Sequence, residues 1–207
     1  MTVRSRKIGA LALLPALVLA CLALTSCDSK VGTAAVVNGT KISESDVNQQ
    51  VVKDAKDVAQ GRGFVLNYLI RDRLLRSALD SHGGVPDDRS LSKYHDSALS
   101  SLLGQQLSGS DGDKALGQAV GQFGAKASFA PVVLKGMELE YALAAKLGVS
   151  TESQVVTAIR KQNPNVSVNP RYGGWEADKL NITGFSAKQV PVNVSFAEPF
   201  PSSSQQS

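Results

Sequence analysis

The segment from Val36 to Val47, VVNGTKISESDV, constrains the fold more than any other part of the sequence. Asn38-Gly39 lies between two short β-prone runs, residues 34–37 and 40–42, and Asn-Gly is the strongest short signal for a two-residue hairpin. Ser43-x-x-Asp46 has the spacing of a helix-capping box, so a helix is predicted to begin there. Two strands alone are only marginally stable in water. The chain must therefore bring another β-prone segment or a packed helix against this hairpin.

Residues 1–26 have the pattern of an export signal and are expected to lie outside the fold. Basic residues precede an almost unbroken apolar run, Ile8 to Ala23, which is short for a membrane-spanning helix and fits a secretory signal. The sequence Leu24-Thr25-Ser26-Cys27 then resembles the bacterial lipobox, which implies cleavage before Cys27 and a diacylglycerol on its thiol. The alternative is an ordinary signal peptide with a chance cysteine. With lipidation, residues 27–33 become a tether to the outer face of the cell membrane.

Charge and cysteine content narrow the function classes. The whole chain carries 22 basic and 18 acidic residues, and removal of the signal leaves 19 basic residues against 18 acidic ones. A net charge near neutrality, without an RGG, RNP or zinc-finger pattern, gives no support for a nucleic-acid partner. Cys21 leaves with the signal and Cys27 would be acylated. No disulfide is therefore expected, and the domain must be held together by its hydrophobic core.

Apolar periodicity predicts a series of helices after the hairpin. The first is expected to run from Ser43 to about Ala59 and to break at Gly61-Arg62-Gly63. The second, from Phe64 to His82, has the broadest apolar face. The remaining helices are predicted over residues 87–107, 114–127, 128–147 and 151–162.

Glycines mark several boundaries in this helical region. A turn is predicted from Gly109 to Gly112, and Gly148 is expected to cap the fifth helix. Gly117 and Gly121 lower the stability of the fourth helix, because each costs roughly 0.5–1 kcal/mol relative to alanine. Their small-xxx-small spacing is compatible with close helix packing and equally with a flexible segment.

The residue pattern changes after residue 164, where helical periodicity ends. Val166-Ser167-Val168 alternates as a strand does, Val190 to Val194 is again β-prone, and residues 198–207 are rich in Pro, Ser and Gln, which is typical of disorder. We therefore predict that the hairpin pairs with short C-terminal strands and that the helices lie between them. The expected fold is mainly α, with the domain at residues 34–197 and a disordered tail at 198–207.

Residues 34–51, AAVVNGTKISESDVNQQV, resemble the opening of the SurA N-terminal-like chaperone domain of SurA-, PrsA- and PpiD-type folding factors. The segment VNPRYGGWEAD, residues 168–178, is similar to the closing segment of lipid-anchored SurA-like proteins from actinobacteria. The helices between the two segments carry no specific motif. The residues of the first segment that match the family pattern are Ala35, Val37, Asn38, Gly39, Ile42, Ser43, Asp46 and Val47.

This resemblance implies a SurA-type helical domain that holds exported polypeptides outside the cytoplasm without ATP. Proteins of this family often add a parvulin prolyl isomerase domain of mixed α/β structure. Here only one helix is predicted between residue 148 and Val166, and the two histidines, His82 and His95, lie in the helical body. We therefore expect no isomerase domain and no catalytic residues. The motifs of P-loop proteins, zinc proteases and serine hydrolases are also missing from the sequence.

Candidate sites are few. His82 and His95 have no second histidine or cysteine at ligand spacing, and Asp111-Gly112-Asp113 lacks the later ligands of a calcium loop, so neither a metal nor a cofactor is expected. Tyr172 and Trp175 are the candidate binding residues, as an aromatic surface for clients. The alternative is that Trp175 fills a seam of the core. Any further client surface would consist of apolar residues that the helices leave unburied.

The leading hypothesis is a lipid-anchored extracytoplasmic chaperone whose partners are nascent or unfolded exported polypeptides and, through Cys27, the membrane. Two alternatives stay open. One is a structural or interaction lipoprotein that docks a single dedicated envelope partner, and the other is a peptidyl-prolyl isomerase.

Overall fold

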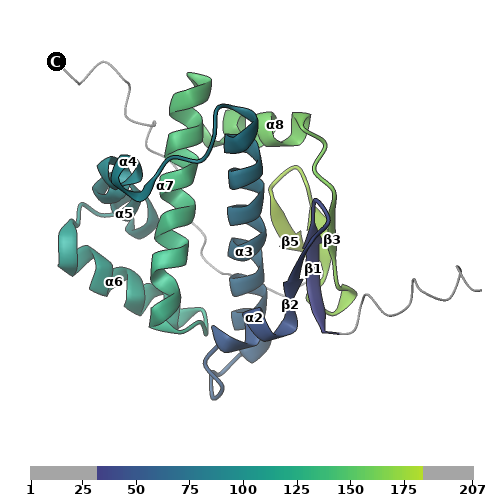
Figure 1. The fold of residues 1–207 in the computed structure, drawn as a ribbon. Helices are drawn as coiled ribbons and strands as arrows, with labels where there is room; N and C mark the ends of the chain where they lie inside the picture. The colour runs from purple at the N-terminus through teal and green to yellow at the C-terminus, as the bar shows by residue number, and fades with distance from the viewer. Residues whose placement is uncertain (1–31, 184–207) are drawn as a thin grey trace, which may run out of the picture. The chain divides into compact units, whose positions relative to one another are not determined.

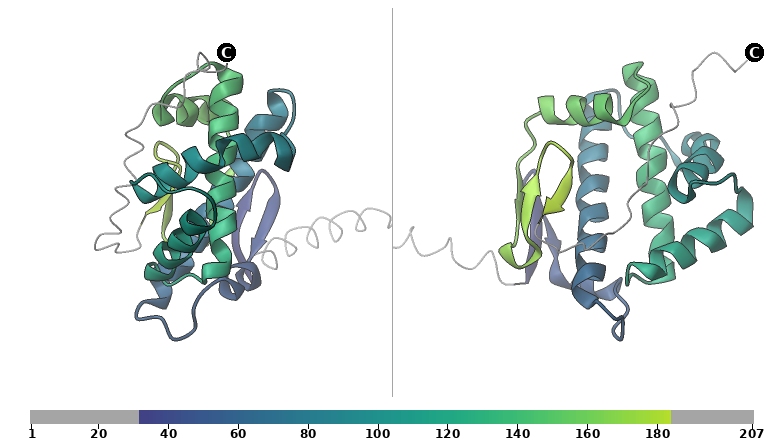
Figure 2. Two further views of the ribbon diagram at one scale, coloured as in Figure 1. Left: turned by 90° about the vertical axis from the view of Figure 1, so that its left-hand side faces the viewer. Right: turned by 180° about the vertical axis from the view of Figure 1, so that it is seen from behind.

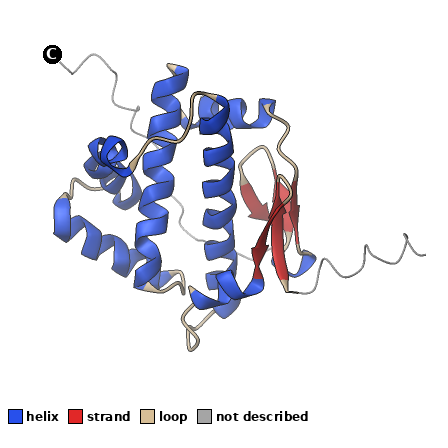
Figure 3. Cartoon of the chain, in the orientation of Figure 1, coloured by secondary structure: helices blue, strands red, loops and turns tan. Residues whose placement is uncertain are grey.

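The computed structural model describes residues 32–183, which form a mainly helical body with a small antiparallel sheet (Figures 1 and 3). The predicted signal and almost all of the predicted tether lie outside the described residues. So do the β-prone segment from Val190 to Val194 and the tail predicted at 198–207. Across residues 32–183, no helix has the length and apolar character needed to cross a membrane.

The sheet confirms the predicted hairpin and its predicted pairing with a distant segment. Strands β1 (Thr33–Val37) and β2 (Thr40–Ser43) pair through the turn at Asn38-Gly39, where both residues have positive φ, as the two-residue turn requires. Strand β3 (Val166–Val168) pairs antiparallel with β1, so the order is β2-β1-β3. The central strand thus joins the two ends of the domain.

Helices α3 (Val58–Ser81) and α7 (Ala130–Leu147) lie side by side at the centre of the body (Figure 1). Contacts between the two helices occur in the same order along both of them, from N-terminus to C-terminus. The rings of Phe64 and Phe129 are 6.3 Å apart, and the ion pair of Arg71 and Glu140 follows further along. Lys146 then reaches the carbonyl of His82 beyond the end of α3. The two helices therefore run in the same direction, and the intervening segments must return the chain to the start of α7.

The start of the helical body differs from the prediction. Helix α2 (Glu44–Gln49) has the predicted capping box, with Ser43 and Asp46 bonded to each other's backbone N–H groups, but it ends ten residues before Ala59. The chain leaves the helix because residues 50–52 bond to a loop at 124–126: Val52 N–H donates to the Gly124 carbonyl, and Lys126 N–H donates to the Gln50 carbonyl. This long-range pairing overrides local helix propensity.

The predicted break at Gly61-Arg62-Gly63 is wrong, because α3 begins at Val58 and passes through all three residues. Gly61 is needed for space and not for a turn. A Cβ atom at Gly61 would lie 2.7 Å from the Gly124 carbonyl oxygen, so only glycine allows this approach. The predicted end of the helix near His82 is confirmed.

The segment from 87 to 122 also differs from the prediction (Figure 2). The helix expected over 87–107 is divided into α4 (Asp88–Leu91), the 3₁₀ turn η1 (Ser92–Tyr94) and α5 (His95–Leu103), which ends at Gly104 with a φ of 65°. The turn predicted at Gly109 to Gly112 is wrong, since α6 (Gly109–Gln122) begins there. Gly112 lies in that helix where a Cβ would meet the side chain of Leu99 at 2.7 Å.

The later elements follow the prediction more closely. After the 3₁₀ turn η2 (Ala127–Phe129), α7 ends at Gly148 with a φ of 65°, which confirms this cap. Helix α8 (Glu152–Lys161) begins at a Thr151 cap and leads to β3. The turn η3 (Pro170–Tyr172) then precedes β4 (Gly174–Glu176) and β5 (Asn181–Thr183), a second hairpin that the sequence pattern did not predict.

Candidate functional site

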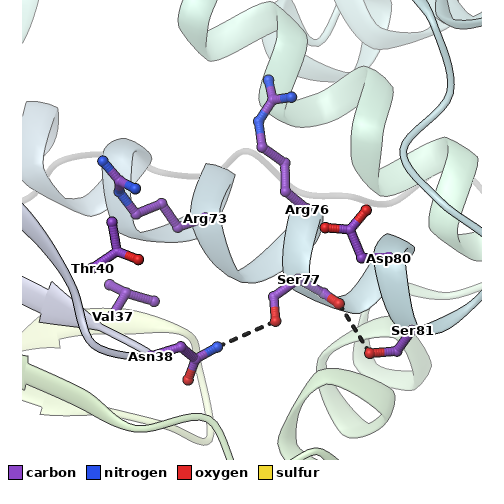
Figure 4. A pocket seen from close by; sticks show the side chains of 8 residues that line it. All are labelled: Val37, Asn38, Thr40, Arg73, Arg76, Ser77, Asp80 and Ser81. Carbon is purple, nitrogen blue, oxygen red and sulfur yellow. Dashed lines mark hydrogen bonds between the residues drawn. The ribbon is translucent and has the colours of Figure 1, made fainter.

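A groove of about 530 Å³ lies between the first hairpin and the C-terminal half of α3 (Figure 4). Strand β2 is an edge of the sheet, so its outer side carries no neighbouring strand among the described residues. The groove is thus bounded by a strand edge on one side and by a helix on the other. Its lining residues are Val37, Asn38, Thr40, Arg73, Arg76, Ser77, Asp80 and Ser81.

The helical wall of the groove follows from residue spacing on α3. Arg73, Ser77 and Ser81 are four positions apart and therefore share one face, while the apolar residues of α3 turn into the core. The two serines are short, so they leave room that longer side chains would fill. Ser81 donates its hydroxyl to the Ser77 carbonyl one turn earlier, which keeps that short side chain against the helix.

Asn38 fixes the position of the strand wall. Its backbone N–H donates to the Asn165 carbonyl at 2.8 Å, and its side-chain oxygen accepts from the Asn165 N–H at 2.9 Å. Its side-chain amide donates to the Ser77 hydroxyl at 3.2 Å (Figure 4). One turn residue therefore connects the hairpin, the entry to β3 and helix α3, and it holds the groove open at a defined width.

The charged side chains of the groove differ in how closely they are paired with opposite charges of the protein. Arg76 donates through Nε to both carboxylate oxygens of Asp72, at 2.9 and 3.0 Å, and this hydrogen bond raises the pKa of Arg76. Arg73 donates only to the Lys41 carbonyl at 3.4 Å, on the outer edge of β2. Within residues 32–183, neither Arg73 nor Asp80 has an opposite charge within ion-pair distance. Arg73 nevertheless adds to the effect of the Ser43 hydrogen bonds that lower the pKa of Asp46, and Asp80 adds to the effect of Asp72 that raises the pKa of Arg76. The groove thus carries Arg73 near one end and Asp80 near the other, and each has a more distant opposite charge in the protein, Asp46 and Arg76 respectively.

A second, smaller groove of about 250 Å³ lies beside α7 and is more apolar. Its floor contains Ala142, Ala145 and the half-buried ring of Tyr94, and Lys93 and Lys146 flank it. Lys93 Nζ lies 4.8 Å from the centroid of the Tyr94 ring, and Lys146 donates to a backbone carbonyl. Both cations are therefore already engaged with the protein.

The candidate binding residues from the sequence lie elsewhere. Tyr172 is only 1% exposed and donates its hydroxyl to Glu44 Oε2 at 2.5 Å, so an exposed aromatic role does not fit its position. Burial, followed by this hydrogen bond, raises its pKa. Trp175 is half-buried on β4 and packs against the core, opposite Ile182 on β5. Both residues join the C-terminal segment to the body.

We expect Tyr172→Phe to lower the free energy of unfolding by about 1–3 kcal/mol, because Glu44 would lose a buried donor. Tyr94→Phe is a matched control, since no hydrogen bond of the Tyr94 hydroxyl is present within residues 32–183. Urea unfolding followed by circular dichroism measures both variants. Equal losses in the two variants would mean that the hydroxyl bond to Glu44 adds nothing.

The histidines and acidic residues considered from the sequence form no metal site in the part that the structure describes. Among residues 32–183, no group of three or more His, Cys, Asp or Glu side chains is placed to hold a metal. His82 caps the end of α3. His95 lies with its two ring nitrogens each 3.4 Å from a carboxylate, of Glu138 and of Asp113, on opposite sides of the ring. The run Asp111-Gly112-Asp113 is helical.

Sequence reasoning missed a buried charge cluster formed by Arg71, Glu140 and Glu152. The Arg71 guanidinium lies 2.9 Å from Glu140 and 3.3 Å from Glu152, and the Glu140 side chain is only 3% exposed. Burial opposes the charge of Arg71, but the two carboxylates outweigh burial and raise its pKa. Nothing in the local sequence around these residues indicates that three helices meet there.

The cluster has two carboxylates for one guanidinium, and its contribution to stability therefore depends on pH. Burial, and then the neighbouring Glu140, raise the pKa of Glu152 above its ordinary value of 4.5. The folded protein thus holds this proton more tightly than the unfolded chain does, so the resulting stability is present below pH 4.5 and is lost as pH rises through the folded pKa.

We therefore expect the stability of the wild type to fall relative to that of Glu152→Gln as pH rises from about 4 to 7. The difference between the two proteins isolates this group from the other titrating residues. Urea unfolding at several pH values measures it. A difference that stays constant or changes in the other direction would contradict the assignment.

Little apolar surface is left over on this body. Among the described residues, Val52 is the most exposed large hydrophobic residue, with 38% of its surface accessible. The client surface expected from unburied apolar residues is thus limited, within residues 32–183, to Val52 and to side chains that are partly buried against the core, such as Leu102 and Leu147.

The chain matches no protein-family model, no curated protein and no solved structure.

Proposed function

We propose that this protein is a lipid-anchored extracytoplasmic chaperone that holds exported polypeptides without ATP, and that its domain is of the SurA N-terminal type. The observation that carries the proposal is that strands from the two ends of the domain pair with each other. Residues 34–51, which resemble the start of the family domain, fold into a hairpin and a capped helix. This hairpin pairs with β3, which directly precedes the second segment that resembles the family, residues 168–178. Both segments thus contribute to one structural unit.

The groove supports a particular way of holding clients. A strand edge offers backbone hydrogen bonds to any extended chain, whatever its side chains, as a chaperone with many clients requires. The paucity of exposed apolar surface in residues 32–183 argues against binding through a broad hydrophobic face. In this proposal, an unfolded segment lies along β2 within the groove, bonded to the backbone of Lys41 and packed against the polar side chains of α3.

Anchoring through Cys27 is part of the proposal. Two acyl chains bury enough methylene groups for stable membrane attachment, at about 0.8 kcal/mol per CH₂. Attachment would confine the protein to the outer face of the membrane, where exported chains emerge, and would raise the frequency of encounter.

We expect Cys27→Ser to move the protein from the membrane pellet to the soluble fraction and to abolish incorporation of radiolabelled palmitate. Cys21→Ser is the matched control and should change neither readout. Unchanged palmitate incorporation in Cys27→Ser would contradict lipidation at this residue.

Light scattering of an aggregating client tests the chaperone proposal. The full chain, purified in detergent, should suppress aggregation at near-stoichiometric amounts, whereas an inert protein in the same detergent should not. Several unrelated clients are needed, because a chaperone of this kind recognises backbone more than sequence. Lack of suppression for all of them would overturn the proposal.

The scarcity of exposed apolar residues favours a second candidate, an envelope lipoprotein that docks one dedicated partner. A single stoichiometric partner in affinity purification from membranes, together with no suppression of aggregation, would support it. We propose no catalytic activity. A protease-coupled proline-peptide assay should show no rate enhancement, and a clear enhancement would instead support a prolyl isomerase.

A further inference from the structure

We propose that the groove beside β2 prefers extended peptide segments in which an acidic residue stands four positions before a basic one. This inference deepens the proposed function, on which it rests, because it assigns a client chemistry and a direction to the groove. It depends on three features of the described residues: the free edge of β2, the separated charges of α3, and the relative direction of these two elements.

The first feature is a backbone position on the outer edge of β2. The pair Val37–Thr40 closes a two-residue hairpin, and such a closing pair exchanges both backbone hydrogen bonds. The next pair, Val36–Lys41, therefore does not, and the N–H and C=O of Lys41 point away from β1. Arg73 already donates to that carbonyl, which shows that the position accepts a donor from the groove side. A guest strand would bond to the Lys41 N–H and would take the place of Arg73 at the Lys41 carbonyl, which would free the guanidinium for a side chain of the guest.

The second feature is the separation of charge along α3. Arg73 and Asp80 are seven positions apart, about 10 Å along the helix axis. The Arg73 guanidinium reaches toward the carbonyl of Lys41, and Figure 4 shows Asp80 at the other end of the groove, beyond Ser77. The C-terminal end of α3, at Ser81, adds a negative dipole beside Asp80. Arg76 also lines the groove, one turn before Asp80, but its charge is paired with Asp72. The groove therefore has Arg73 as its main cation at one end and Asp80 as its main carboxylate at the other.

The spacing of these charges fits side chains four positions apart on an extended chain. Residues of a strand that share one face recur every second position, so the fourth lies about 13 Å away at roughly 3.3 Å per residue. That length exceeds the 10 Å helix rise, and the long Arg73 side chain, which leans toward the N-terminus of α3, adds to the separation of the two charges. Side chains two positions apart, at about 7 Å, would fall short of one of the two charges.

The third feature sets the direction of the guest. Strand β2 starts at Thr40, near Ser77, and runs toward Ser43, past the carbonyl that Arg73 contacts. Antiparallel strand pairs outnumber parallel ones about two- to three-fold, and a guest that pairs antiparallel with β2 passes the Arg73 end first and the Asp80 end second. The acidic side chain must therefore precede the basic one in the guest sequence.

Fluorescence polarisation tests this inference. The probe is a labelled, end-capped peptide of Thr, Ser and Val with a glutamate four positions before a lysine, and the control peptide has these two residues exchanged. The full chain in detergent should bind the probe about tenfold more tightly than the control. Arg73→Glu should remove this preference, whereas Arg89→Glu, an exposed charge reversal on α4, should leave it unchanged.

The double variant Arg73→Glu/Asp80→Lys reverses the groove and should prefer the exchanged peptide. Circular dichroism checks that each variant is folded, and Asp80→Asn serves as a milder second variant that should weaken the preference by itself. Equal affinity of the wild type for both peptides would overturn the inference. If aggregation of clients is still suppressed in that case, the proposed chaperone function stands and only the client chemistry is wrong.

Discussion

Replacing Arg71 by methionine is expected to lower the free energy of unfolding by about 3–5 kcal/mol, the largest loss of any single change considered for this protein. Glu140 is 2% exposed, and Arg71 is its closest cationic partner at 2.9 Å. Without the guanidinium, a buried carboxylate loses its compensating charge, and Glu152 adds further repulsion. The helices that contribute these residues, α3, α7 and α8, would be destabilised together.

A double variant separates the charge from the packing. Arg71→Met/Glu140→Gln removes both members of the closest pair and should recover more than half of the loss, because no uncompensated charge remains at Glu140. Urea unfolding followed by circular dichroism gives both free energies. A loss below about 1 kcal/mol in Arg71→Met would show that the cluster is hydrated and not structural.

Replacing Gly61 by alanine should lower the free energy of unfolding by about 2–3 kcal/mol, although alanine is the better helix former. The new Cβ would lie 2.7 Å from the Gly124 carbonyl oxygen and 3.1 Å from Val51 Cγ1. The first contact is with backbone, which cannot rotate away. The α3 start and the loop at 124–126 would have to separate, with loss of the hydrogen bonds that residues 50–52 make there.

Gly121→Ala is the matched control for this change. Gly121 is the second-last residue of α6, and nothing stands within 4 Å of the position of its Cβ, so alanine should raise stability slightly, by about 0.5 kcal/mol or less. Thermal and urea unfolding of both variants should therefore give effects of opposite sign. Stabilisation by both substitutions would mean that the Gly124 carbonyl oxygen lies further than 2.7 Å from the position of a Cβ atom at residue 61.

Local signals in the sequence were sufficient wherever a short segment determines its own conformation. Asn38-Gly39 predicted the turn, Ser43 and Asp46 predicted the start of α2, and Gly148 predicted the end of α7. The pairing of β1 with β3 was also predictable, because the isolated hairpin needed a partner and Val166 to Val168 was the nearest β-prone candidate after the helices.

The errors have a common physical cause, which is contact between segments distant in sequence. Gly61 and Gly112 look like helix breakers, but both lie within helices: the backbone of Gly124 approaches Gly61 too closely for a side chain, and the Leu99 side chain packs against Gly112. Helix α2 ends early because residues 50–52 bond to a loop more than seventy positions away. Local propensity contains no information on either contact.

The candidate site was only partly predictable. The polar face of the predicted helix at 64–82 contains Arg73, Ser77 and Ser81 at a spacing of four, and two short side chains in such a stripe are a signal that could have suggested a hollow. The opposite wall depends on the hairpin packing against this face, which the sequence did not show. Tyr172 was chosen for its aromatic ring, yet its hydroxyl bond to Glu44 places it inside.

Site-specific cross-linking in intact cells tests the central claim, that the groove holds newly exported polypeptides. A photo-reactive residue in place of Thr40, which is exposed at the mouth of the groove, would capture whatever lies there, and the same residue in place of Arg89 would report background. We predict adducts of many different masses at position 40 that disappear when export is blocked. One adduct of fixed mass that persists after the block would contradict the chaperone account and indicate a single dedicated partner.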